Sequence, residues 1–195
     1  MKWTLPNILT VLRLLAAPGV AIMFLYFARP WADWFALVLF VTAAITDFFD
    51  GYLARLWKQE SKIGAMLDPI ADKAMVVIAL MVITGFSGMN PWFLLPATLI
   101  MFREVFVSGL REYLGDTAGL LKVTKLAKWK TTAQMVAIAV LFSTGAFEHH
   151  AMKDPDFVDL SQISWFVGVV LLWVAAFLTF ITGMDYFRKA LPYLK

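Results

Sequence analysis

Six long apolar segments constrain this chain to a helical membrane fold. They cover approximately residues 6–27, 34–55, 64–85, 92–114, 129–147 and 163–186. Each is close to the roughly 20 residues that an α-helix needs to cross a bilayer, where the backbone must satisfy its own hydrogen bonds. We therefore expect one all-α membrane domain over residues 1–195, with six transmembrane helices.

The composition supports a membrane protein and excludes several kinds of chemistry. Hydrophobic residues make up 61% of the chain and charged residues 16%, whereas soluble domains average about 45–50% and roughly 25%. The absence of cysteine excludes thiol nucleophiles, disulfides and zinc thiolate sites. A net charge of +3 suits contact with anionic lipid, and without a long basic run we expect no nucleic-acid partner.

The distribution of lysine and arginine predicts the orientation. The links after the first, third and fifth segments contain only Arg29 and Lys153. The other side of the membrane carries Lys2, Arg55, Lys58, Lys62, Lys122, Lys125, Lys128, Lys130, Arg188, Lys189 and Lys195. By the positive-inside rule, both termini and the link between the second and third segments are cytoplasmic. His149 and His150 fall in the last link on the opposite side, where we expect them to be solvated.

Four aspartates interrupt the apolar sequence around the second link. Asp47 and Asp50 are three residues apart and Asp68 and Asp72 four apart, so each pair should lie on one helix face. Four crowded carboxylates repel one another unless cations neutralise them, and oxygen ligands favour Mg²⁺ or Mn²⁺. Solvated or helix-capping aspartates are the alternative interpretation. Because apolar sequence surrounds all four, we favour a site for a metal-bound polyphosphate.

Small residues accompany both pairs. Gly51 and Ala54 follow the first pair and Gly64 precedes the second, so a ligand could approach the backbone, with Arg55 as a nearby cation. Close helix packing is the alternative explanation for small residues in a membrane protein. For Gly64 the two interpretations are equally supported.

The signature of these positions resembles that of a known family. Residues 47–72 read Asp-x2-Asp-Gly-x2-Ala-Arg-x8-Gly-x3-Asp-x3-Asp, which is similar, without a departure, to the signature of the CDP-alcohol phosphatidyltransferases. Residues 6–13 and 125–134, with the pairs Arg103-Glu104 and Arg111-Glu112, are similar to the bacterial members that use sn-glycerol 3-phosphate. The resemblance extends to about Gln134 and includes the six transmembrane helices.

The resemblance implies a reaction and roles for individual residues. The reaction would transfer the phosphatidyl group from CDP-diacylglycerol to sn-glycerol 3-phosphate, giving phosphatidylglycerophosphate and CMP, in a homodimer of the bacterial inner membrane. Two divalent cations, Mg²⁺ or Mn²⁺, would bind Asp47, Asp50 and Asp68, with Asp72 as a further ligand and the general base. The residues implied to contact CDP-diacylglycerol are Gly51, Ala54, Arg55, Gly64, Thr10 and Arg13.

Thr10 and Arg13 lie in the first apolar segment. Arg13 is about two turns from its start, within reach of the cytoplasmic interface. A contact with a lipid headgroup therefore competes with a place near the nucleotide.

A set of basic residues is the candidate site for the phosphate of glycerol 3-phosphate. Arg103 lies near the middle of its segment, where a charge costs roughly 2.5–3.5 kcal/mol, so it should face a polar cavity. Arg111 lies on much the same helix face as Arg103. Glu104 points about 100° away from Arg103 on an ideal helix, so we do not expect the two to pair. The full set is Arg103, Arg111, Lys125, Lys128 and Lys130. For each lysine, contact with anionic lipid is the alternative.

Two other functions remain open. The acceptor within the same family could be inositol phosphate, serine or phosphatidylglycerol. A cation- or proton-coupled transporter also uses carboxylates within the membrane, but its sites tend to lie at the midplane between repeats. Here all four aspartates flank one link, and the sequence contains no second copy of the pattern.

Overall fold

A computed structural model describes residues 4–56, 61–120 and 125–194. The side chains of six predicted site residues lie outside the described part, namely Asp50, Gly51, Ala54, Arg55, Lys125 and Lys128. All regular structure within the described part is helical, which confirms the all-α class. The α-helices are α1 (Leu5–Tyr26), α2 (Trp31–Leu56), α3 (Lys62–Phe86), α4 (Pro91–Leu114), α5 (Lys125–Ala151) and α6 (Asp156–Ala190). Short 3-10 helices follow α4 (Gly115–Leu120) and α6 (Leu191–Tyr193).

The last two helices are longer than hydropathy predicts. α5 begins at Lys125 and α6 at Asp156, so most of the predicted polar link over residues 148–159 is helical. A helix can continue beyond its apolar part because its hydrogen bonds are internal. The placement of His149 and His150 in a non-helical link is wrong, because both lie in α5, where they are half-exposed. The His150 Nε2 atom accepts a hydrogen bond from the Trp34 indole at 3.4 Å.

Several helices could cross a membrane. Within the described residues, α1, α4 and the segment Asp156–Tyr193 are long and apolar enough by length and composition. The structure therefore supports a polytopic helical protein.

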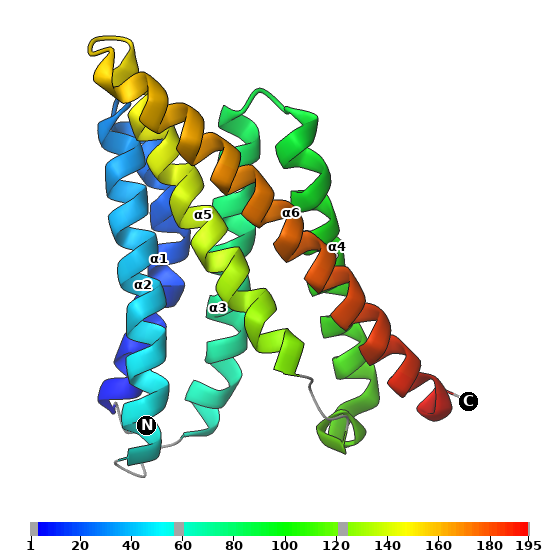
Figure 1. Cartoon of the computed structure of the whole chain (residues 1–195). Helices are drawn as coiled ribbons and strands as arrows, with labels where there is room; N and C mark the ends of the chain where they lie inside the picture. Colours follow the sequence, from blue (N-terminus) through cyan, green and yellow to red (C-terminus); the bar gives the residue numbers. More distant parts are fainter. Residues whose placement is uncertain (1–3, 57–60, 121–124, 195) are drawn as a thin grey trace.

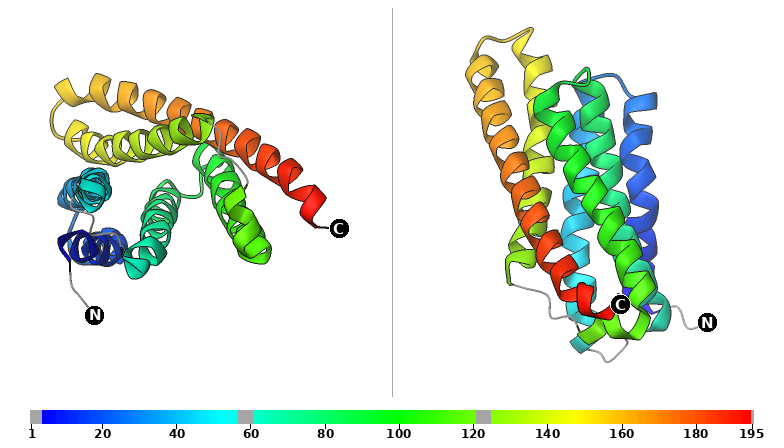
Figure 2. Two further views of the ribbon diagram at one scale, coloured as in Figure 1. Left: turned by 90° about the horizontal axis from the view of Figure 1, so that it is seen from below. Right: turned by 90° about the vertical axis from the view of Figure 1, so that its right-hand side faces the viewer.

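The helices pack as a bundle in which α5 and α6 form a long antiparallel pair (Figures 1 and 2). α1 packs against α2 and α3, α2 also contacts α5, and α4 packs against α6. Several alanines in the core have no exposed surface, which lets the helices approach closely; they include Ala17, Ala36, Ala79, Ala137 and Ala175.

The up-and-down order of the helices gives the bundle two distinct ends (Figure 1). The start of α1, the end of α2, the start of α3 and the end of α6 lie at one end, which we call the aspartate end. The links between α1 and α2, α3 and α4, and α5 and α6 lie at the other, which we call the opposite end. All four motif aspartates belong to the helix segments near the aspartate end.

Candidate active site

Three helices converge on the aspartate motif. Asp47 comes from α2, Asp68 and Asp72 come from α3, and α1 supplies Thr10 and Arg13. The Arg13 Nη1 atom contacts Asp47 and lies 2.8 Å from Asp72 Oδ1, so one guanidinium joins carboxylates of two helices. The Thr10 hydroxyl donates a hydrogen bond to Asp68 Oδ1 at 2.7 Å. The structure thus gathers the three described aspartates around one face of α1.

Burial distinguishes the two interpretations of Arg13. Its side chain is 2% exposed, whereas those of Asp47 and Asp72 are 38% and 41% exposed. A snorkelling arginine would extend its head toward water, but this one turns inward to the carboxylates. Arg13 therefore belongs to the acidic site, and the carboxylates keep an open side at which a ligand could bind.

The first turns of α1 and α3 are joined directly. Ser61 caps α3 by accepting a hydrogen bond from the Gly64 N–H at 3.0 Å, and its hydroxyl donates to Asn7 Oδ1 at 2.7 Å. A Cβ atom on Gly64 would lie 2.8 Å from Asn7 Oδ1. Close packing of α1 against α3 thus explains the small residue at Gly64. Asp68 lies one turn further along α3, so this junction also positions a site carboxylate.

Gly64→Ala should destabilise the protein by about 1–2 kcal/mol, because the added methyl group forces apart two tightly packed helix ends. Thermal unfolding of the purified protein measures the loss. Gly109→Ala is the matched control, since a Cβ there meets nothing within 4 Å. When Asn7 is also replaced by alanine, Gly64→Ala should destabilise the protein less, because the nearest contact of the added methyl group has been removed. An unchanged unfolding temperature for Gly64→Ala alone would contradict this explanation.

A second polar cluster joins α4, α5 and α6. Arg103 Nη1 lies 3.1 Å from Glu104 Oε1, and the same oxygen contacts Lys130 Nζ. Arg103 Nη2 also donates to Thr182 Oγ1 at 3.4 Å. The prediction that Glu104 is not the partner of Arg103 is wrong. Both side chains are long enough to bend across the angle between them, and buried charges are strongly favoured to pair.

Lys73 is also part of this cluster, although it was not predicted from the sequence as a site residue. It follows Asp72 directly, its Nζ donates to Ser108 Oγ, and its charge acts on both Glu104 and Lys130. Arg103, Lys130 and Lys73 carry three positive charges against one negative charge on Glu104, a net charge of +2. Within the described residues Arg103 Nε is buried without a hydrogen-bond partner. The cluster is therefore suited to an anion, and the sequence signal for Lys73 was a lysine inside an apolar span.

Arg111 has different surroundings. It is exposed, and its Cζ atom lies 5.7 Å from the centre of the Tyr186 ring. Eight residues along an α-helix correspond to about 12 Å, so Arg111 is displaced from Arg103 toward the end of α4. The structure consequently brings together Arg103 and Lys130 from the predicted basic set but gives Arg111 a separate aromatic partner.

The donor set of the acidic site fits hard divalent cations. Carboxylate and hydroxyl oxygens are the ligands that Mg²⁺ and Mn²⁺ prefer. The described carboxylates already converge on a positive charge, that of Arg13. Without the side chain of Asp50, the described residues do not form a complete group of three or more acidic or histidine ligands around one point.

Comparisons with known proteins identify the class. The model of the CDP-alcohol phosphatidyltransferase family matches residues 3–181. The chain belongs to this family, which confirms the family predicted from the motif.

The relatives point to one member of that family. A protein of Cereibacter sphaeroides is 66% identical over 218 aligned positions that cover 100% of this chain and 99% of the relative. A Rickettsia bellii protein is 41% identical and a Pectobacterium atrosepticum protein is 36% identical. Each alignment covers 97% of this chain and 96% of the relative. All three are named CDP-diacylglycerol–glycerol-3-phosphate 3-phosphatidyltransferase.

Proposed function

We propose that the protein transfers the phosphatidyl group of CDP-diacylglycerol to sn-glycerol 3-phosphate and releases CMP. The acidic residues beside α1 carry the proposal. Arg13 bridges Asp47 and Asp72, and Thr10, one turn earlier in α1, donates a hydrogen bond to Asp68. The chain is also 66% identical to a relative named for this reaction, over nearly the whole of both proteins.

The acidic site would bind the diphosphate of the donor. Asp47, Asp50, Asp68 and Asp72 would hold two divalent cations, Mg²⁺ or Mn²⁺. When bound, such cations neutralise the diphosphate and stabilise charge on the departing CMP. Thr10 orients Asp68 and Arg13 holds Asp47 and Asp72 in place, as their hydrogen bonds support. The nucleotide would lie along the small residues Gly51 and Ala54, with Arg55 at its phosphates. Gly64, which is covered by Asn7, would contribute by close packing rather than by direct contact.

An apolar groove between α2 and α5 is suited to the acyl chains. Its volume is about 460 Å³, and its lining includes Phe40, Ala44 and Phe49 from α2 and Met135 and Ala139 from α5. Ala44 lies three residues before Asp47, so the groove starts within one helix turn of the acidic site. A lipid whose headgroup occupies the carboxylates could therefore place its chains here.

The chemical step needs a nucleophile, a base and a leaving group. The acceptor hydroxyl attacks the phosphorus that carries diacylglycerol, its proton passes to Asp72, and the bond to the CMP oxygen breaks. No cysteine is available, so a direct in-line displacement accounts for the transfer without a covalent enzyme intermediate.

The cluster of Arg103, Lys130 and Lys73 would bind the acceptor phosphate. With Glu104 included, the net charge of these residues is +2, which matches a phosphate dianion, and arginine and lysine donors suit phosphate oxygens. Lys73 neighbours Asp72 in the chain, which links the phosphate site to the proposed base. Arg111, Lys125 and Lys128 would add positive charge at the same end of the bundle.

Lys130→Gln should raise the KM for sn-glycerol 3-phosphate about tenfold or more, because it removes a charge-assisted hydrogen bond to the phosphate. The KM for CDP-diacylglycerol should change less than about twofold. Steady-state kinetics with each substrate varied in turn measure both. Lys153→Gln, at an exposed lysine of the opposite end, is the matched control. Equal changes in the two KM values would exclude this role for Lys130.

We further propose that all six α-helices span the inner membrane with both termini and the aspartate end in the cytoplasm. The excess of lysine and arginine on that side supports this orientation. A homodimer is proposed from the family resemblance alone.

An assay with the purified protein separates an enzyme from a transporter. With CDP-diacylglycerol and Mg²⁺, adding sn-glycerol 3-phosphate should release CMP, and EDTA should stop the release until excess Mg²⁺ restores it. Sealed vesicles that contain the protein should show no more cation or proton flux than empty vesicles. Flux without CMP release would favour the transporter.

A further inference from the structure

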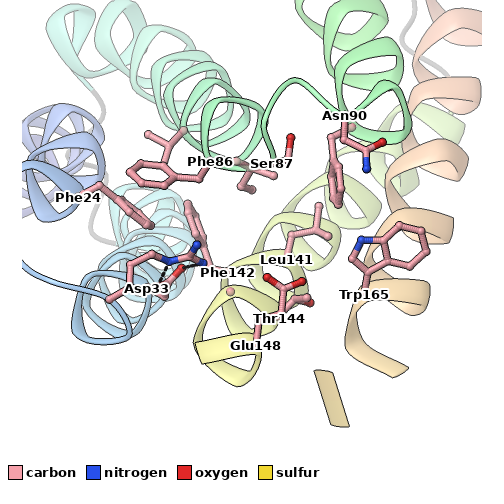
Figure 3. Close-up of a pocket in the computed structure, with 15 residues that line it drawn as sticks. Phe24, Asp33, Phe86, Ser87, Asn90, Leu141, Phe142, Thr144, Glu148 and Trp165 are labelled. Atoms are coloured by element: carbon pink, nitrogen blue, oxygen red, sulfur yellow. Dashed lines mark hydrogen bonds and ion pairs between the residues drawn. The ribbon is translucent and has the colours of Figure 1, made fainter. Parts of the chain in front are cut away.

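A polar cavity lies at the opposite end of the bundle, away from the candidate active site. Its volume is about 260 Å³, and every one of the six α-helices contributes to its lining. Polar and aromatic side chains face each other across it, with Asp33, Thr144 and Glu148 on one side and Phe86 on the other (Figure 3). Neither the family motif nor the proposed reaction uses any of these residues.

The first feature of the cavity is a fixed ion pair. Arg29 donates from Nε and Nη2 to the two carboxylate oxygens of Asp33, both at 2.8 Å. Asp33 is 2% exposed, and a Cβ on Gly145 would overlap both partners, so the pair is held against the backbone of α5. The pair is neutral overall. Glu148, the third charged residue of the lining, therefore gives the cavity a net charge of −1.

The second feature is a pair of hydrogen-bond acceptors at that charge. Thr144 donates its hydroxyl proton to the Val140 carbonyl at 2.9 Å. A hydroxyl has one proton, so Thr144 offers only lone pairs to a ligand. Glu148 lines the cavity with an exposed side chain, and within the described part of the chain it makes no hydrogen bond or ion pair. Glu148 and Thr144 lie one helix turn apart, so their oxygens can act together.

The third feature is the aromatic wall. Phe24, Phe86, Phe142 and Trp165 line the same cavity. The face of an aromatic ring attracts a cation, most strongly away from water. The Arg29 guanidinium already uses this attraction, since its Cζ atom lies 5.7 Å from the centre of the Phe86 ring.

We propose that this cavity binds a primary ammonium group, carried by an aminophospholipid headgroup or by a free amine. An ammonium has three N–H donors for the two carboxylate oxygens of Glu148 and the hydroxyl oxygen of Thr144, and its charge balances Glu148. A quaternary ammonium has no such donors. A divalent metal would require more carboxylate ligands than the single uncompensated one here.

The electrostatics of Glu148, which follows the fifth predicted span, agree with an ammonium ligand. Burial raises the pKa of Glu148, Arg29 lowers it, and Asp33 raises it, with a net upward shift. A bound cation would offset the cost of ionising this carboxyl group.

Calorimetric titration of the full-length protein in detergent tests the proposal. The probes are dihexanoyl phosphatidylethanolamine and ethanolamine, with their trimethylated counterparts dihexanoyl phosphatidylcholine and choline. Binding of both amine probes assigns recognition to the ammonium alone, and binding of only the lipid assigns it to the headgroup; each supports the site. The trimethylated probes should bind at least about tenfold more weakly.

Variants locate the binding. Glu148→Gln should weaken the amine probes at least about tenfold because it removes the negative charge, and Thr144→Val severalfold because it removes one acceptor. Asp159→Asn, an exposed acidic position of the same end, should have no effect. Retained CMP release shows that the variants are folded. Equal affinity for primary and trimethylated probes, no binding of either amine, or full affinity in Glu148→Gln would overturn the proposal.

Discussion

Asp72→Asn should lower turnover by about 10³-fold or more while leaving the affinity for CDP-diacylglycerol within about fivefold of the wild type. An asparagine cannot take the proton of the attacking hydroxyl. Its amide oxygen can still accept the hydrogen bond that Arg13 Nη1 gives to Asp72 at 2.8 Å, so the site should keep its shape. Single-turnover CMP release measures the rate, and equilibrium binding of the donor lipid measures the affinity.

Asp185→Asn controls for a general effect of removing a carboxylate at the aspartate end, because Asp185 pairs only with Lys189 within the described residues. It should retain nearly full activity. If Asp72→Asn kept more than about a tenth of wild-type turnover, Asp72 would not be the base. If instead the variant lost donor binding and turnover together, its role would be confined to holding the donor.

Arg13→Gln should make the stability of the protein dependent on divalent cations. Breaking a buried ion pair costs about 3–5 kcal/mol. Because the Asp47 and Asp72 side chains are 38% and 41% exposed, we expect a smaller loss of about 2 kcal/mol. Without Arg13, bound Mg²⁺ becomes the main counter-charge for the two carboxylates. Adding Mg²⁺ should therefore raise the unfolding temperature of the variant by several degrees more than that of the wild type.

The wild type in Mg²⁺ and in EDTA provides the baseline, and Arg29→Gln tests an ion pair at the opposite end. That second variant should be destabilised without gaining sensitivity to Mg²⁺. Equal Mg²⁺ responses of Arg13→Gln and the wild type would show that the cation does not bind beside Asp47 and Asp72.

The spacing of the aspartates was enough to predict which carboxylates share a helix face. Residues three or four apart lie on one face of a helix whatever the surrounding fold, so Asp68 and Asp72 could be grouped from the sequence alone. The contribution of α1 could not be settled in this way. Arg13 had two possible environments, and only the packing of α1 against α2 and α3 places it between Asp47 and Asp72.

Contacts between distant segments account for what the sequence did not predict. Glu104 pairs with Lys130, 26 residues later in the chain, as well as with its neighbour Arg103. Helical angles describe where a side chain leaves the backbone, not where a long side chain ends. The cavity at the opposite end likewise depends on Gly145 of α5 meeting Arg29 and Asp33. Only the four-residue spacing of Arg29 and Asp33 gave a local signal of pairing.

The most direct test of the proposed function is the choice of acceptor by the purified protein. With CDP-diacylglycerol and Mg²⁺ supplied, the lipid product formed with sn-glycerol 3-phosphate, inositol phosphate, serine or phosphatidylglycerol is identified by mass spectrometry. We predict phosphatidylglycerophosphate and CMP in equal amounts with sn-glycerol 3-phosphate, and no comparable product with the other three. Preferential transfer to any of those three would contradict the proposed acceptor.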